Sequence, residues 1–100
     1  MVKLRELAYT RSGDKGSSAN IGVIGYTEAD YLILKEKLTE SKVQEFFKPF
    51  GATSTVRYEL DNLGALNFVI KDVLKGGGSL SLRSDSQGKG FGQRILEMEL

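Results

Sequence analysis

The chain has 100 residues, of which 40% are apolar and 27% charged, and its 14 basic and 13 acidic side chains leave a net charge of +1. This length and composition suit one small hydrophobic core and predict a single domain over residues 1–100. The absence of cysteine and histidine excludes disulfides, thiolate nucleophiles, zinc ribbons and a Ser-His-Asp triad, and the near-zero charge argues against nucleic acid as a partner. The N-terminal segment lacks a signal-peptide pattern and the longest apolar run spans only residues 31–34, so we expect a cytoplasmic protein with no membrane partner.

The first predicted elements are two strands separated by a polar loop. The alternation over Val2–Thr10 changes phase part-way, which predicts a strand with a bulge near Glu6. Arg11–Ser18 combines glycine, serine and aspartate in the way that is typical of a loop. Asn20–Tyr26 is apolar on both faces and predicts a strand in the interior of a sheet, where its two glycines indicate close backbone approach or a bulge.

A helix is predicted next. Thr27 is a favoured N-cap residue, and acidic side chains follow it in the first turn. Tyr31, Leu34 and Leu38 recur at helical spacing and indicate a face that packs on the sheet.

A second, shorter helix follows. Ser41 and Gln44 match a capping box at its start, and Pro49 and Gly51 are expected to end it. Its apolar residues have helical spacing and are interpreted as core rather than as a ligand site: Val43, Phe46, Phe47 and Phe50.

The remaining sequence predicts two strands, two helices and a loop. Thr53–Leu60 alternates cleanly and predicts a strand, and Asp61–Asn62 is expected to cap a helix that the glycine run 76–78 ends. Ser79–Arg83 predicts another strand, and Ser84–Gly92 a second polar loop. One side of the expected third helix carries Leu63, Leu66, Ile70 and Val73.

The last segment fits a helix through Phe91, Ile95 and Met98, or a strand through Leu96, Met98 and Leu100, and we favour the helix. The resulting order β–β–α–α–β–α–β–α predicts an α+β sandwich. In it, a four-stranded, mostly antiparallel sheet carries helices on one face, and the ferredoxin-like arrangement is the nearest common architecture.

The loop Arg11–Ser18 is the strongest candidate for a ligand site. Its glycines allow successive backbone N–H groups to turn toward one point, and Arg11 and Lys15 add positive charge, which together predict an anion-binding nest. The spacing fits neither a Walker loop nor a dinucleotide fingerprint. The alternative is an ordinary β–β connection in which Asp14 caps the turn and Asn20 bonds the backbone of its own loop.

Other combinations of polar residues carry weaker hypotheses. A Ser12–Lys15 pair has the elements of a nucleophile and its base, and Asp14 with Asp85 would suit a divalent cation if their loops converged. Asn67 on the expected third helix is either exposed or a buried hydrogen-bonding residue. We predict no cofactor, no metal and no catalytic residue. The predicted ligand-binding residues are Arg11, Ser12, Gly13, Asp14, Lys15, Gly16, Asn20, Asn62 and Asn67.

Three segments of the chain are distinctive: LAYTRSGDKGSSANIGVIGY at 7–26, YELDNLGALNFVI at 58–70 and SLSLRSDSQGK at 79–89. In this order they resemble the C-terminal ferredoxin-fold domain of the acyclic terpene utilisation (AtuA-like) family. The resemblance covers nearly the whole chain, and its RSGDKG, NIG and NLGALNF blocks are the most specific parts. Where the family often has a second acidic residue directly after GDKG, this chain has Ser17, which weakens any paired-carboxylate metal site.

The resemblance implies a function but no catalytic residues. In the family this piece typically follows a much larger domain, so the chain resembles a stand-alone version that pairs with a separately encoded large AtuA-like domain. Family members are associated with the breakdown of acyclic terpenes and branched acyl-CoA compounds, beside acyl-CoA carboxylase subunits. No catalytic residue is firmly assigned to the small domain, so none is carried over to this sequence.

We therefore expect a small non-catalytic binding or assembly module, accessory to that catabolism, which binds a CoA-type anion at Arg11–Asn20. The alternative is a small acyl-CoA-processing enzyme with Asp14 or Lys15 as acid/base. Nucleic-acid binding would need exposed tyrosines on the sheet, and the charge argues against it. An exposed sheet edge favours a homo-oligomer.

Overall fold

One antiparallel sheet organises the molecule. The computed structural model describes residues 2–15, 17–73 and 89–100, with the backbone alone at 14, 15, 89 and 90. In this part of the chain, four strands pair in the order β1-β2-β4-β3. Their bounds are β1 Ala8–Lys15, β2 Ser18–Gly25, β3 Ser54–Leu60 and β4 Ala65–Lys71.

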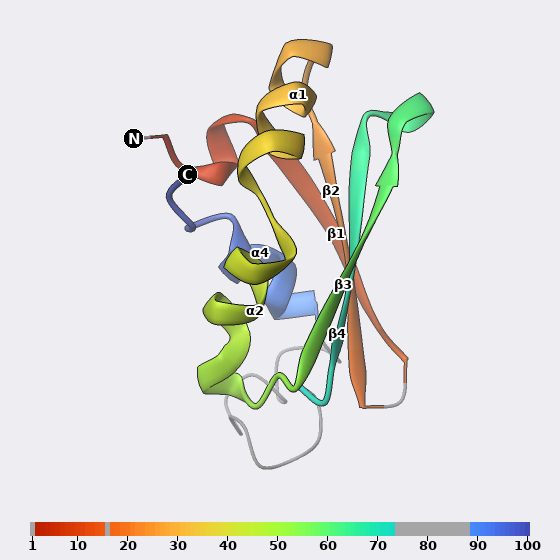
Figure 1. The fold of residues 1–100 in the computed structure, drawn as a ribbon, viewed down its shortest axis with the longest axis vertical. Helices are drawn as coiled ribbons and strands as arrows, with labels where there is room; N and C mark the ends of the chain where they lie inside the picture. Colours follow the sequence, from red (N-terminus) through yellow and green to blue (C-terminus); the bar gives the residue numbers. More distant parts are fainter. Residues whose placement is uncertain (1, 16, 74–88) are drawn as a thin grey trace.

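The helices lie on one face of this sheet, and no described element covers the other face (Figure 1). Helix α1 (Glu28–Lys37) packs on β2, α2 (Glu40–Phe47) on β3, and α4 (Lys89–Ile95) on β1. This arrangement confirms the predicted α+β, ferredoxin-like sandwich. None of the described helices has the length and apolar character needed to span a membrane.

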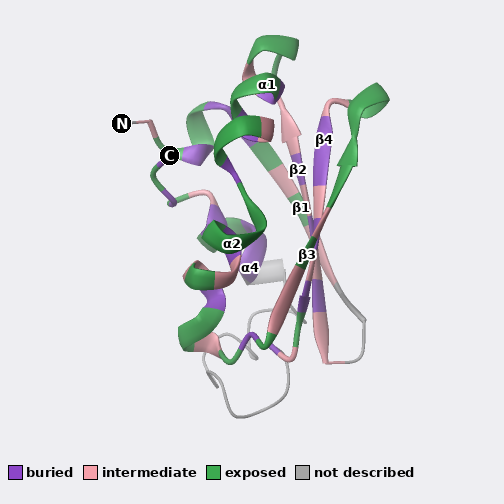
Figure 2. Ribbon diagram, viewed as in Figure 1, coloured by how far each residue is buried: buried purple, intermediate pink, exposed green. Residues whose placement is uncertain are grey.

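The core fills the space between the sheet and the helices (Figure 2). Phe47 of α2 is fully buried and meets Phe91 of α4 edge-on, with ring centroids 5.5 Å apart. Phe46 and Phe50 pack against the same core, which confirms that the aromatic stripe is structural. Burying one such ring contributes about 1.5–3 kcal/mol, so these rings are a main attachment between α2 and α4.

Local signals identified several elements correctly. Thr27 caps α1, because its side chain accepts a 3.0 Å hydrogen bond from the backbone N–H of Asp30. The buried face of that helix carries Tyr31 and Leu34, as its spacing predicted. Asn20–Tyr26 and Thr53–Leu60 were predicted as strands, and they correspond to β2, which is interior to the sheet, and β3.

The predicted strand over Val2–Thr10, with its bulge near Glu6, is wrong in its first half. The chain makes a 3-10 turn at Leu4–Glu6, and β1 starts only at Ala8. Leu4 and Leu7 are both buried, and their separation of three residues is the period of that turn. The change of phase in the sequence therefore marks a turn entering the strand.

The predicted loop over Arg11–Ser18 is also wrong, because most of it is strand. Strand β1 continues to Lys15 and β2 begins at Ser18, with Arg11 opposite Gly22 and Gly13 opposite Asn20. Pairing in the ladder supplies the hydrogen bonds that a loop would have to find elsewhere. Polar residues and glycine are tolerated there because half of these positions face the uncovered side of the sheet.

The start of α2 differs from the predicted capping box at Ser41 and Gln44. Thr39 is the N-cap, with its side chain accepting from the backbone N–H of Lys42. Gln44 instead bridges to the sheet: its amide donates to the Ala52 carbonyl at 2.9 Å, and its oxygen accepts from Thr55 at 2.7 Å. Gln44 therefore bonds to residues of another segment, and the predicted local capping box with Ser41 does not form.

The helix predicted after Asp61–Asn62 does not exist. Asp61–Leu63 forms a 3-10 turn that ends at Gly64 in the left-handed region (φ 61°), and β4 follows. Leu66 and Ile70 are four residues apart, which fits both a helix and a strand, but Phe68 between them is also buried. The true period is two, and Asn67 therefore lies on a strand, on the face away from the helices.

The C-terminal segment is partly as predicted. The favoured helix is confirmed as α4, which ends at Ile95, whereas Lys89–Gly92 was expected in a loop and belongs to that helix. The predicted strand Ser79–Arg83, the glycine run 76–78 and the rest of the second polar loop lie outside the described residues. In the described part the order is β–β–α–α–β–β followed by α4.

Candidate binding groove

The uncovered face of the sheet presents side chains in cross-strand rows. Residues directly opposite each other in an antiparallel pair project on the same side, so the strand register determines each row. Three rows across β1, β2, β4 and β3 are Tyr9–Ile24–Ala65–Leu60, Arg11–Gly22–Asn67–Tyr58 and Gly13–Asn20–Val69–Val56.

Three small residues run diagonally across these rows. Gly13 on β1 lies in the row nearest the β1–β2 turn. Gly22 on β2 lies in the next row, and Ala65 on β4 in the row after that. A groove of about 610 Å³ is lined by all three. Because small residues leave space between larger neighbours, the diagonal forms its floor.

Gly22 lies at the centre of that floor. A Cβ atom placed there would be 3.7 Å from Asn67 Oδ1 and 3.9 Å from Ile24 Cδ1, which are ordinary contact distances. The missing side chain therefore deepens the groove, and the space is not taken up by a neighbouring group.

The two ends of the groove differ in polarity. Asn20 lines it in the row nearest the β1–β2 turn and Arg11 in the middle row, whereas Ile24 and Leu60 line it in the far row, together with Leu63 of the following turn. Leu63 is 67% exposed, so this apolar end faces solvent.

Most of the predicted ligand residues with described side chains meet at this groove. Arg11, Gly13, Asn20 and Asn67 all line it. Ser12 also contributes to the lining, but its hydroxyl lies on the helix side of β1, 2.8 Å from where a Cβ at position 92 would stand.

The other predicted residues are placed elsewhere or lie outside the description. Asn62 is exposed in the 3-10 turn and borders a separate hollow beside Tyr26 and Tyr31. Gly16, Asp85 and the side chains of Asp14 and Lys15 lie outside the described residues, and with them the Ser12–Lys15 pair and the Asp14–Asp85 cation site. The anion nest required a loop of free amides, and strand pairing replaces that loop.

Sequence reasoning missed the apolar end of the groove: Tyr9, Ile24, Leu60, Leu63 and Ala65. The signal in the sequence that could have revealed the groove was the short connection of a β-hairpin. Once β1 and β2 are joined by residues 16 and 17, Gly13 must face Asn20 and Arg11 must face Gly22. Interpreting Arg11–Ser18 as a loop hid this register.

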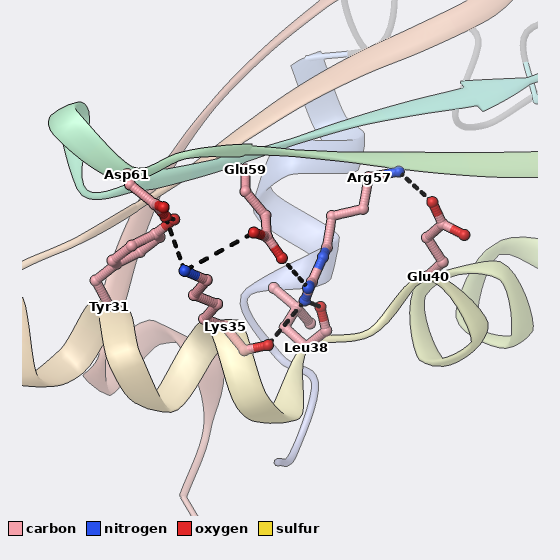
Figure 3. Close-up of polar contacts among 7 residues, drawn as sticks. All are labelled: Tyr31, Lys35, Leu38, Glu40, Arg57, Glu59 and Asp61. Atoms are coloured by element: carbon pink, nitrogen blue, oxygen red, sulfur yellow. Dashed lines mark hydrogen bonds and ion pairs between the residues drawn. The ribbon is translucent and has the colours of Figure 1, made fainter.

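A second polar cluster joins the helices to β3 (Figure 3). The hydroxyl of Tyr31 donates to Asp61 Oδ1 at 2.6 Å, and Lys35 Nζ lies 3.1 Å from the same oxygen. Burial, reinforced by this hydrogen bond, raises the pKa of Tyr31 to about 12. The hydrogen bonds from Tyr31 and Lys35 hold the pKa of Asp61 below its usual value.

Arg57 is the centre of the same cluster. Its guanidinium donates 3.0 Å hydrogen bonds to the carbonyls of Lys35 and Leu38 at the C-terminal end of α1, and it pairs with Glu59. Its backbone N–H donates to Glu40 of α2, so α2 covers part of the β3 edge. These contacts attach an edge strand to the helices, and we interpret the cluster as structural.

The groove has the chemistry of a binding site. Its described side chains supply one guanidinium, two amides, a phenol and several aliphatic groups. Among the described residues, no three Asp or Glu side chains converge as a metal site would require. Guanidinium and amide groups donate hydrogen bonds to anions and carbonyls, and the aliphatic end offers apolar contact.

Comparison with known proteins gives one match. A family model described as the AtuA ferredoxin-like domain matches residues 2–100. No curated protein and no solved structure matches significantly. The sequence blocks that carry the resemblance, RSGDKG, NIG and NLGALNF, supply nine of the groove-lining residues: Arg11, Ser12, Gly13, Asn20, Gly22, Leu63, Ala65, Leu66 and Asn67.

Proposed function

The chain belongs to the AtuA ferredoxin-like domain family, and on that basis we propose that it is a non-catalytic binding module accessory to the breakdown of acyclic terpenes or branched acyl-CoA compounds. Its groove on the open sheet face holds an anionic, CoA-type ligand, with Arg11 as the cationic contact. The observation that supports this proposal is the convergence of the family's characteristic blocks on one groove.

The charge of the open face supports an anionic ligand. Among the described strand side chains on that face, the charged ones are Arg11 and Lys71, and both are basic. In the described part of the chain Arg11 forms no ion pair, so its charge is not neutralised by a neighbour there. A guanidinium is well suited to carboxylate and phosphate groups because its planar donors match their geometry.

The remaining side chains suit the other parts of a CoA-type compound. Tyr9 and Tyr58 are 47% and 52% exposed, and exposed phenol rings provide stacking surfaces for an adenine base. The amides of Asn20 and Asn67 can donate to and accept from the amide groups of a pantetheine arm. The same proposal includes cytoplasmic location and assembly with copies of itself, a separately encoded large AtuA-like domain or acyl-CoA carboxylase subunits.

Calorimetric titration with CoA and with octanoyl-CoA tests the proposal. We expect Arg11→Gln to weaken binding of both at least tenfold, about 1.4 kcal/mol, while circular dichroism and the unfolding midpoint stay unchanged. Lys42→Gln is the matched control, because Lys42 is an exposed cation on α2, on the opposite side of the sheet. Failure of either compound to bind the wild-type chain, or equal affinities of Arg11→Gln and wild type, would contradict the proposal.

A further inference from the structure

We propose that the diagonal groove binds a monocarboxylate with an extended apolar chain, oriented with its carboxylate at Arg11 and its chain directed toward Leu60 and Leu63. This inference rests on the proposed function for the location of the site, and it goes beyond it by naming a second class of ligand, the free acid in place of its CoA thioester, and the direction in which that acid lies. The inference depends on the length of the groove and on the order of polar and apolar groups along it. Binding of the CoA moiety alone requires neither of these features.

The first support is the position of the cations. Arg11 faces Gly22 in the middle row, and Lys71 lies opposite Ser54, nearer the β1–β2 turn than any of the three groove rows. Arg11 therefore lies one row, and Lys71 three rows, nearer the β1–β2 turn than Leu60, so both described cations of the open face lie on the turn side of the apolar row. Arg11 lines the groove itself, beside Asn20, so an arginine and an amide can together hold the two oxygens of one carboxylate.

The second support is the apolar surface at the other end. Leu60 is 37% exposed and Leu63 67% exposed, and Ile24 and Ala65 lie beside them along the lining. In the described strands and the turn Asp61–Leu63, no charged side chain lines this end of the groove. An apolar chain is the complementary occupant, and covering it here would strengthen binding up to about fourfold for each buried methylene.

The third support is the length of the diagonal. Its floor spans β1, β2 and β4, and the lining continues to Leu60 on β3, so Arg11 and Leu60 are separated by three strand spacings of about 4.8 Å, about 14 Å before any displacement along the strands. The floor at Gly22 is open, with the nearest atoms at contact distance from where a side chain would begin. The groove is thus long and continuous from Arg11 to its apolar end.

The test is a titration with octanoate, decanoate and dodecanoate, each below its micelle concentration, run beside CoA. We expect affinity for the wild type to rise with each added pair of methylenes. Arg11→Gln should weaken all three acids about tenfold and leave this chain-length dependence in place. Gly22→Leu, which fills the floor, should abolish binding of all three.

Leu63→Ser identifies the direction of the chain. It should flatten the chain-length dependence, with dodecanoate losing more affinity than octanoate. Leu32→Ser is its matched control, because Leu32 is a similarly exposed leucine (58%) on the outer side of α1 and should change nothing. Circular dichroism and urea unfolding establish that each variant is folded.

The outcomes separate this inference from the proposed function. If CoA binds through Arg11 but affinity for the acids does not depend on chain length, the proposed function stands and the inference is overturned. Equal effects of Leu63→Ser and Leu32→Ser would overturn the orientation. A dimer that dissociates in Gly22→Leu, with no acid bound, would assign this face to a second copy of the chain and also overturn the inference.

Discussion

The hydroxyl of Tyr31, on α1, donates a 2.6 Å hydrogen bond to Asp61, the first residue of the turn between β3 and β4. It connects the helix layer to the end of the hairpin that also forms the apolar end of the groove. The pKa values of the two groups move in opposite directions. Burial, and after it this hydrogen bond, raises the pKa of Tyr31, whereas the hydrogen bonds from Tyr31 and Lys35 lower the pKa of Asp61. The link is therefore intact over the whole neutral range.

Raising the pH should break this link through Tyr31. The folded pKa of about 12 lies above the value of 10.0 for a free phenol, so the folded chain holds this proton more tightly than the unfolded chain. The contribution to stability is complete below pH 10 and is lost as the pH rises toward 12. We expect the urea midpoint of the wild type to fall more steeply over this window than that of Tyr31→Phe. The difference in phenolate absorbance between the two proteins should show one group titrating near pH 12.

Lowering the pH should act through Asp61. Because its folded pKa is depressed, the unfolded chain takes up this proton first, and the contribution to stability is present above the unfolded pKa and lost as the pH falls through the folded one. We expect the stability of Asp61→Asn to depend less on pH than that of the wild type below about pH 4. Identical profiles for Asp61→Asn and wild type would show that the link contributes nothing in acid.

Two glycines of β2 should respond oppositely to the same substitution. A Cβ at Gly25 would stand 2.9 Å from the backbone nitrogen of Tyr31, and helical backbone cannot yield as a side chain can. Gly25→Ala should therefore lower the free energy of unfolding by about 1–3 kcal/mol. Gly22→Ala places its methyl in the open groove and should be neutral or stabilising, because alanine restricts the unfolded chain more than glycine does. Urea unfolding of both variants measures the contrast, and equal losses would contradict it.

Removing the guanidinium of Arg57 should destabilise the end of α1. The side chain is only 16% exposed and bonds the carbonyls of Lys35 and Leu38, which have lost their helical partners. Arg57→Met keeps the aliphatic stem and should lower the free energy of unfolding by about 1.5–3 kcal/mol. Arg57→Lys should recover only part of this, because one ammonium cannot reproduce the planar fork. Hydrogen exchange should report faster opening of the last turn of α1 in both variants.

The correctly predicted elements depend on short-range patterns. The cap at Thr27 and the buried positions Tyr31 and Leu34 follow from spacing within one turn of helix. The apolar run of β2 correctly predicted an interior strand, which has a partner strand on each side, although only alternate residues of it are buried. These signals survive because no distant contact competes with them.

The errors occur where two local patterns coincide or where a distant partner decides. Leu66 and Ile70 satisfy both a helical and a strand period, and only pairing of this segment with β2 and β3 selects the strand. In β3 the alternation identifies the strand but not its orientation. Arg57 faces the helices and Tyr58 faces solvent, because α1 offers unpaired carbonyls to a guanidinium.

From the order of its residues alone, the start of α1, the aromatic core, the interior strand and the family of this protein could be predicted, since each depends on neighbours within a few positions or on contiguous blocks of sequence. The groove required the folded chain. Gly13, Gly22 and Ala65 align only after three strands have paired in register, and pairing depends on contacts between residues up to about fifty positions apart. The same register brings Arg11, Leu60 and Leu63 into one groove, and short-range sequence patterns do not encode it.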